Sequence, residues 1–131
     1  MLRVLTLISA LAMLATTSVA LAQGDARIER VQFAAGTSGA TIRDRITGYE
    51  VVRYLLGAQA GQAMNVRMTT ANTFTYFNIL KPSAPQGPAM VRGEITHEIN
   101  TFSGALPESG DYVIEVYMVR AEARRGGVAD F

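Results

Sequence analysis

The strongest chemical signal in the sequence is a cluster of arginines near its C-terminal end. Arg120, Arg124 and Arg125 lie where the most regular strand pattern of the chain, at 111–121, comes to its end. In an extended chain Arg120 and Arg124 point to the same side, about 13 Å apart at ~3.3 Å per residue. In a helical turn they come within one turn of each other. Guanidinium groups bind carboxylates in a planar, bidentate manner. The cluster therefore predicts a surface that binds acidic groups, with a solvated strand end as the alternative.

A second candidate is Tyr49, which follows Gly48 at a break between two expected strands. An exposed tyrosine offers a large contact area at low ordering cost, together with a hydroxyl group. The alternative is a tyrosine packed in the core or at a corner of the fold. If the binding interpretation is correct, Tyr49, Arg120 and Arg124 must converge at one exposed rim of the domain.

Residues suited to catalysis or metal binding are scarce. His97 is the single histidine, and the chain contains no cysteine. A lone histidine in an expected strand has no second histidine with which to share a metal, and it is more often a surface or packed residue than a general base. The sequence has no Gly-x-Ser-x-Gly elbow, and its acidic residues are scattered singly. We therefore expect no enzyme activity, no catalytic residues, no metal site and no cofactor.

The composition is that of one folded domain. The chain has 131 residues, of which 49% are hydrophobic and 18% charged, and this apolar content suits a globular protein. The formal charge of +1 argues against a nucleic-acid partner, because nucleic-acid binding leaves a clearly basic footprint.

The N-terminal residues have the pattern of a secretory signal peptide at 1–22. Arg3 supplies a positive charge, residues 4–15 are an apolar stretch, and Ala20-Leu21-Ala22 has the small-x-small form of a cleavage site. Cleavage would leave a single domain at 23–131, periplasmic or secreted and free of the membrane. The alternative is an uncleaved membrane anchor, because the uncharged run that begins at Val4 is long enough to span a bilayer of ~30 Å.

Short β-segments separated by turn residues at intervals of about ten predict an all-β fold, an antiparallel β-sandwich of seven or eight strands. The proline-rich segment 81–88 and the segment 100–110 are expected to be loops, and 126–131 a frayed tail. No segment shows a sustained helical period, and short glycine-rich turns favour hairpins between neighbouring strands. The expected strands are 27–33, 41–47, 49–58, 64–69, 73–80, 89–99 and 111–121.

Three stretches of the sequence resemble the periplasmic inhibitors of g-type lysozyme, a bacterial family of small secreted β-sandwich proteins. Residues 48–66 are similar to the family's Gly-Tyr strand and Ala-x-x-Gly-Gln turn. Residues 106–116 resemble its Leu-Pro-x-Ser-Gly-x-Tyr strand entry. Residues 118–125 resemble its Arg-x-x-Ala-Arg signature. The first two stretches also occur in other secreted sandwich domains, so the arginine signature is the most discriminating of the three.

The resemblance implies that Tyr49, Arg120 and Arg124 take part in inhibition, with Arg125 beside them. It also implies a lysozyme as the protein partner, g-type favoured, from a host or a competitor. Such an inhibitor inserts its arginine and tyrosine side chains into the enzyme's acidic active-site groove, where carboxylates act on the glycan. Buried arginine and tyrosine anchors of this kind dominate the energetics of protein interfaces.

A second function stays open at this point. The same sandwich would also suit a non-inhibitory binding module of the cell envelope, which would hold a glycan or another protein on an aromatic face. The candidates for that face are Phe74, Tyr76 and Phe77. The sequence does not indicate the oligomeric state.

Overall fold

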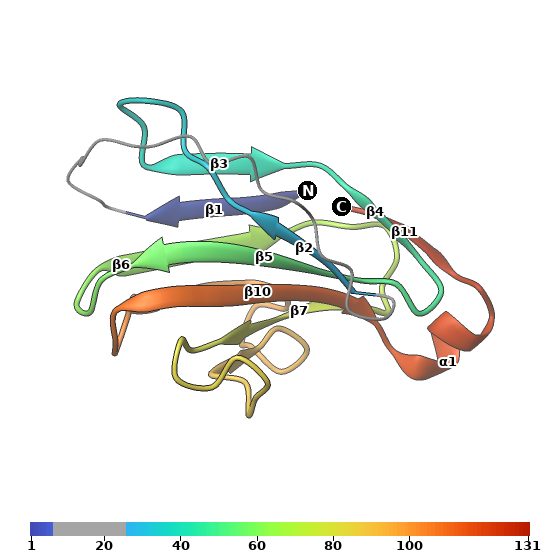
Figure 1. Ribbon diagram of the computed structural model, residues 1–131. Coiled ribbons are helices and arrows are strands. Elements are labelled where there is room, and N and C mark those ends of the chain that lie inside the picture. The colour runs from blue at the N-terminus through green and yellow to red at the C-terminus, as the bar shows by residue number, and fades with distance from the viewer. Residues whose placement is uncertain (7–25) are drawn as a thin grey trace.

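Two sheets packed face to face make up the protein in the computed structural model, which describes residues 1–6 and 26–131 (Figure 1). The predicted all-β sandwich is confirmed. A single short helix among the described residues, α1 (Arg120–Arg124), lies at one end of the sandwich. The strands are β1 (Leu2–Thr6), β2 (Ala26–Arg30), β3 (Gly39–Ile42), β4 (Arg45–Thr47), β5 (Val51–Ala58), β6 (Ala63–Met68), β7 (Thr75–Leu80), β8 (Val91–Arg92), β9 (Thr101–Ala105), β10 (Gly110–Met118) and β11 (Val128–Asp130).

The strands are arranged in two main sheets and one short ladder. One sheet has the order β3-β1-β6-β9 and the other the order β2-β5-β10-β7-β8, while β11 pairs with β4. All pairs are antiparallel except β2 with β5, which are parallel. The expected hairpins are mostly wrong: among the described strands only β7 and β8 are both consecutive and paired. The connections instead cross from one sheet to the other, because each strand must bury one face against the opposite layer.

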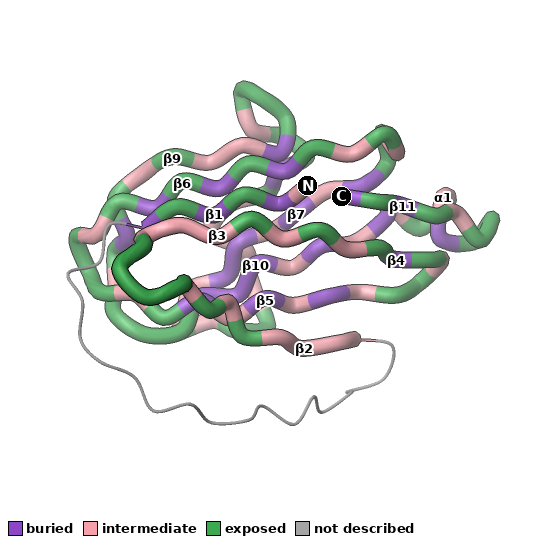
Figure 2. Tube along the Cα trace, turned by 90° about the horizontal axis from the view of Figure 1, so that it is seen from above, coloured by how far each residue is buried: buried purple, intermediate pink, exposed green. Residues whose placement is uncertain are grey.

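The core follows from the two-residue alternation of the strands. In β6, Met64, Val66 and Met68 point inward, and their neighbours in the sequence are exposed. The same alternation of buried and exposed residues is visible along β1 and β6 (Figure 2). From the opposite sheet, β5 and β10 contribute a second set of side chains with almost no exposed surface. These are Val52, Tyr54, Leu56, Tyr112, Ile114 and Val116.

Residues 2–6 form β1, in the interior of one sheet. Leu2 and Val4 are fully buried, and the strand pairs with β3 on one side and β6 on the other. These residues belong to the predicted signal peptide, whose remaining part and cleavage site at 7–22 lie outside the described residues. A chain cleaved after residue 22 would lack β1. No helix in the described ranges is long and apolar enough to cross a bilayer.

Two sequence-based expectations between residues 89 and 110 are wrong. Only Val91 and Arg92 of the expected strand at 89–99 are in a strand, and β9 lies within the expected loop. The reason is Asn100, which is buried beside β7. Its side-chain oxygen accepts a hydrogen bond from the Phe77 N–H at 3.1 Å, and its amide nitrogen donates to the Thr75 carbonyl at 2.9 Å. The Asn100 side chain thereby occupies backbone groups of β7 that a longer β8 would use.

The expected frayed tail at 126–131 is also wrong. Strand β11 pairs with β4, and the backbones of Asp44 and Phe131 exchange two hydrogen bonds of 2.9 and 3.0 Å. Ala129 and Phe131 are buried in the core. The C-terminal segment is therefore fixed to the sandwich, and this attachment also holds α1, which immediately precedes it in the chain.

Candidate binding site at one end of the sandwich

The turn between β4 and β5 presents Tyr49 to solvent. Gly48 adopts a positive φ of 60°, a conformation that glycine accepts without a steric penalty. The Gly48 N–H donates to the Gly127 carbonyl at 2.8 Å, so this turn is tied to the segment that follows α1. Glu50 closes the turn, because its carboxylate accepts the Thr47 N–H at 2.8 Å. As a result Tyr49 is 55% exposed and lies at the rim rather than in the core.

Helix α1 begins where β10 ends, and it turns the chain back toward β4. Ala123 is buried under the helix, and its N–H donates to the Val119 carbonyl at 2.9 Å. Gly126 follows the helix with a φ of 70°, the left-handed conformation in which glycine commonly ends a helix. Since the buried face of α1 is occupied by Ala123, Arg120 and Arg124 are both exposed. The sequence left open whether this segment is extended or helical, and the structure selects the helix.

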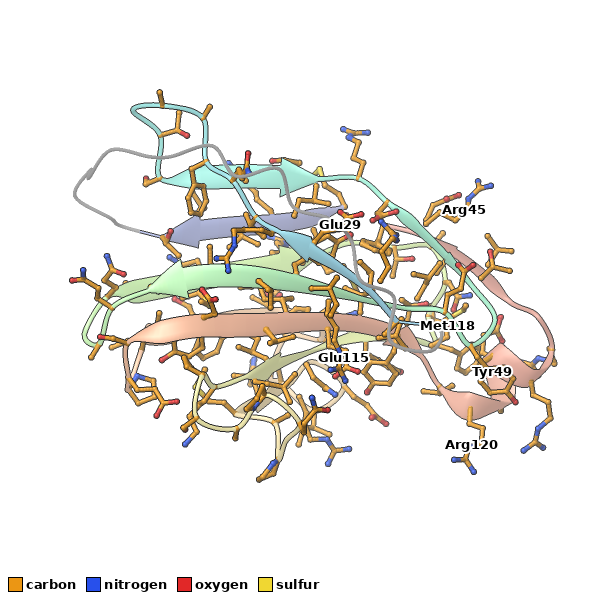
Figure 3. The ribbon with its side chains drawn as sticks, viewed as in Figure 1. Glu29, Arg45, Tyr49, Glu115, Met118 and Arg120 are labelled. Carbon is orange, nitrogen blue, oxygen red and sulfur yellow. The ribbon has the colours of Figure 1, made fainter. Side chains whose placement is uncertain are left out.

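The turn and the helix meet around one surface pocket. Tyr49 and Arg120 both line it, and the pocket has a volume of about 340 Å³. Figure 3 shows the two side chains at the same end of the sandwich, beside α1. Arg124 is four residues farther along the same short helix. The structure thus brings Tyr49 and Arg120 together at one exposed rim, and Arg124 is exposed on the same helix.

The guanidinium groups of Arg120 and Arg124 make no hydrogen bond or ion pair within residues 1–6 and 26–131. Many other arginines in this part of the chain are paired, with carboxylates on neighbouring strands or loops. The pairs outside the site are Arg27 with Glu29 and Asp44, Arg30 with Asp111, Arg45 with Asp130, Arg53 with Glu115, Arg67 with Glu98 and Arg92 with Glu94. Arg120 and Arg124 are therefore available to an external carboxylate without breaking an internal contact.

Arg125, in contrast, is engaged within the protein. Its guanidinium forms an ion pair with Glu122, which keeps the pKa of that carboxyl below its ordinary value. The guanidinium carbon also lies 6.0 Å from the centre of the Phe74 ring, within the range of a cation–π contact. Asn72 donates a hydrogen bond to Glu122 at 3.3 Å and another to the Val128 carbonyl at 3.1 Å. These contacts brace α1 against the loop before β7.

A partly buried polar cluster surrounds Asp44, the residue directly before β4. Both oxygens of the Asp44 carboxylate accept hydrogen bonds from a single nitrogen of Arg27, Nη2, at 2.8 and 2.9 Å, and one of them also accepts the Tyr54 hydroxyl at 2.5 Å. Burial opposes the charge of Asp44, but these bonds and the Arg45 N–H outweigh it and lower the pKa of Asp44. Burial and the neighbouring Asp44 carboxylate raise the pKa of Tyr54. The sequence analysis did not identify this cluster, because its members are distant in sequence and belong to no motif.

The residues considered for other functions do not form a site. Phe74 is 47% exposed, whereas Phe77 is fully buried in the core. The aromatic face that an envelope-binding module would need is therefore not formed by this set. His97 lies exposed in a turn, not in a strand as expected. Within the described part of the chain, no group of three histidine or acidic side chains is placed to hold a metal ion.

Comparison with known proteins identifies solved structures that the chain resembles. No protein-family model and no curated protein matches it. The crystal structure of PliG from Aeromonas hydrophila, a periplasmic lysozyme inhibitor of g-type lysozyme, is 37% identical, with a TM-score of 0.72 and coverage of 80% of this chain and 90% of that chain.

Two further inhibitors of g-type lysozyme have the same fold. A PliG mutant from Escherichia coli is 23% identical with a TM-score of 0.59, and PliG from Salmonella Typhimurium is 23% identical with a TM-score of 0.58. Each alignment covers 79% of this chain and 90% of the other. At this identity the two structures support the fold alone, whereas the Aeromonas protein is similar in sequence as well.

Proposed function

The chain belongs to the family of periplasmic inhibitors of g-type lysozyme, and from this we propose that it inhibits a g-type lysozyme by inserting Arg120, Arg124 and Tyr49 into the active-site groove. The protein is periplasmic, and it is a binding protein rather than an enzyme. Arg125 takes part indirectly, because its contacts with Glu122 and Phe74 hold α1 in place.

The observation that carries this proposal is the pair of unpaired guanidinium groups on α1 beside an exposed tyrosine. Lysozymes work with carboxyl groups that flank the glycosidic bond. An arginine can bind such a carboxylate through two parallel hydrogen bonds, which are stronger than bonds between neutral groups. Arg120 and Arg124 would occupy the position of the substrate and neutralise the groups that cleave it, while Tyr49 packs against the wall of the groove.

The position of these residues at one end of the sandwich supports the same mechanism. A groove accepts a protruding edge more readily than a flat sheet face, and the β4–β5 turn and α1 form such an edge (Figure 3). The Gly48–Gly127 hydrogen bond ties the turn to the segment after the helix. The three side chains therefore approach the groove as one unit.

The test is an inhibition assay with the mature protein. Purified residues 23–131 are mixed with a g-type lysozyme, and the lysis of a cell-wall suspension is followed by turbidity. We expect lysis to stop at a near-equimolar ratio. A c-type lysozyme serves as the specificity control and is expected to remain active. Undiminished lysis by the g-type enzyme at a large excess of the protein would refute the proposed function.

We also propose that the chain is processed after Ala22 during export. The mature domain then lacks the residues of β1, which lie between β3 and β6 in the sheet. The intact mass of the protein purified from the periplasm tests this proposal, because cleavage predicts a chain that begins at Gln23. A mass equal to that of the full chain would contradict it and would leave β1 in place.

A further inference from the structure

Residues 1 and 131 meet inside one sheet, where β11 and β1 follow each other like two halves of one strand. The backbones of Phe131 and Asp44 exchange two hydrogen bonds, and in the neighbouring ladder Leu2 stands opposite Ile42. By this register Met1 comes directly after Phe131 along the strand line, with no position left between them. Figure 2 shows the two chain ends side by side in this layer.

The alternation of buried and exposed side chains also continues through this junction without a change of phase. Ala129 and Phe131 are buried, and Leu2, Val4 and Thr6 continue the buried series on the same side. The residues between them are exposed or half-buried. Because side-chain direction in a strand repeats every second residue, both segments present one face to the core.

Processing after Ala22, as proposed above, removes the second half of this strand, and the inference rests on that processing. The β1 slot is the place between β3 and β6 that Leu2–Thr6 occupies in this structure. There β1 pairs with β3 at four positions and with β6 at five. Its loss leaves the facing N–H and C=O groups of both strands without these partners. It also uncovers the apolar side chains that pack against Leu2 and Val4 in the core.

Strand β11 remains after processing and holds the neighbours of the slot apart. β3 continues into β4 after two residues, and β4 pairs with β11. On its other side β11 contacts the segment that follows β6, because the Asn72 amide donates to the Val128 carbonyl at 3.1 Å. Since neighbouring strands lie about 4.8 Å apart, β11 fixes a gap one strand wide at the end of the slot, directly after Phe131.

We propose that the β1 slot of the processed protein binds an extended peptide as an added strand, which runs in the direction of β11. In this mode of recognition the main-chain hydrogen bonds provide affinity, and alternate side chains provide specificity. Leu2 and Val4 are fully buried, so the ligand carries aliphatic side chains at these inward positions. Arg3 and Leu5 face outward, and their positions accept polar residues. The occupant is a strand of another chain with this pattern.

Thr6 marks the third inward position of the ligand. Its side chain is buried, and its hydroxyl oxygen has no hydrogen-bond partner within residues 1–6 and 26–131. Burying a hydroxyl group without a partner is unfavourable, whereas valine has nearly the same shape and lacks this group. A ligand with valine at this position should therefore bind more tightly than the sequence of residues 1–6 itself.

The experiment titrates the processed protein, purified from the periplasm and shown by mass to begin at Gln23, with a synthetic peptide of residues 1–6. We expect calorimetry to show one bound peptide per protein, and the Tm of the protein to rise. The control peptide combines Arg3→Val with Val4→Arg, which keeps the composition but turns a charge inward. We expect it to bind at least about tenfold more weakly, because a buried unpaired charge is unfavourable. The Thr6→Val peptide should bind more tightly. Equal binding of the native and control peptides would overturn the inference.

A fused strand tests the same slot without depending on the affinity of a free peptide. Residues 1–6 are appended directly after Phe131, because the register leaves no position to bridge. We expect this fusion to have a higher Tm than the processed protein and to bind no peptide. One glycine inserted at the junction shifts the alternation by one residue and should cancel most of the gain. If the two fusions unfold at the same temperature, the slot does not accept a strand and the inference is wrong.

Two other outcomes are also decisive. A periplasmic protein with the mass of the unprocessed chain keeps β1 in place, so the slot is never open and the inference fails. A processed protein that binds the peptide but does not inhibit g-type lysozyme refutes the proposed function and leaves the strand site intact. The failure of the one proposal is therefore distinguishable from the failure of the other.

Discussion

Replacing Arg120 with alanine gives the most direct test of the arginine mechanism. In the free protein this guanidinium has no partner among the described residues, and a surface substitution of this kind changes stability by about 0.5 kcal/mol or less. A buried arginine anchor in an interface is worth ~2–4 kcal/mol when truncated. Since 1.4 kcal/mol corresponds to a factor of ten, the Kd for lysozyme should rise about 30- to 700-fold. The Tm should remain almost unchanged.

The assay combines calorimetric titration with the turbidity of a lysed cell-wall suspension. Arg120→Lys separates the two properties of arginine, because lysine keeps the charge but cannot form two parallel hydrogen bonds with a carboxylate. We expect its binding to fall between that of wild type and Arg120→Ala. Arg124→Ala should raise the Kd by a smaller factor in the Arg120→Ala variant than in the wild-type protein, because the two side chains share one helix and one target.

Arg43→Ala is the matched control for this series. Arg43 is also exposed and forms no ion pair in the described part of the chain, but it lies between β3 and β4 and lines a different depression of the surface. We expect its Kd to stay within twofold of wild type. If the Arg120→Ala, Arg124→Ala double variant also binds within twofold of wild type, the arginines do not enter the groove and the mechanism is refuted.

Two further predictions concern the supports of the site. Asp44→Asn should destabilise the fold by about 1–2 kcal/mol at pH 7, because it weakens charged hydrogen bonds with Arg27 and Tyr54. Since the folded state lowers the pKa of Asp44, this contribution is present above the unfolded pKa and is lost as the pH falls through the folded pKa. Urea unfolding of both proteins should therefore show a smaller difference at pH 3 than at pH 7, and an unchanged difference would contradict the assignment. Arg125→Ala should weaken lysozyme binding less than tenfold and lower the Tm slightly, whereas a loss as large as that of Arg120→Ala would place Arg125 in the groove itself.

The sequence predicted the parts of the fold that local alternation determines. Residues 64–69 alternate between apolar and polar side chains, and β6 buries the apolar set against the opposite sheet. The break at Gly48 correctly indicated a turn, which made a rim position one of the two alternatives for Tyr49. In both cases a few consecutive residues contain the information, because side-chain direction in a strand repeats every second residue.

The parts that the sequence did not predict depend on contacts between distant residues. The tail at 126–131 begins with two glycines, which favour a loop, but Phe131 enters a core built by strands elsewhere in the chain. So short a segment gives no indication of that contact. Likewise, Asn100 interrupts the expected strand at 89–99 only because β7 lies beside it.

The N-terminal residues illustrate a different limit. Leu2, Val4 and Thr6 alternate with exposed residues and are buried in β1 of the full chain. The same apolar residues also begin the pattern of a signal peptide. A short apolar run is compatible with a buried strand and with an export signal, because both require low polarity and neither requires a particular periodicity over so few residues. The intact mass of the exported chain distinguishes a strand that is kept from a signal peptide that is removed.

The arrangement of the site explains how so short a helix is held in one conformation. An isolated helix of five residues is unstable in water, because nucleation is costly and few hydrogen bonds repay it. Here α1 is fixed by the burial of Ala123, by the contacts of Glu122 and by the pairing of β11 with β4. Because α1 is already ordered in the folded domain, the free energy of binding does not include the entropic cost of ordering it. Loosening α1 by Glu122→Ala should therefore weaken binding in a calorimetric titration.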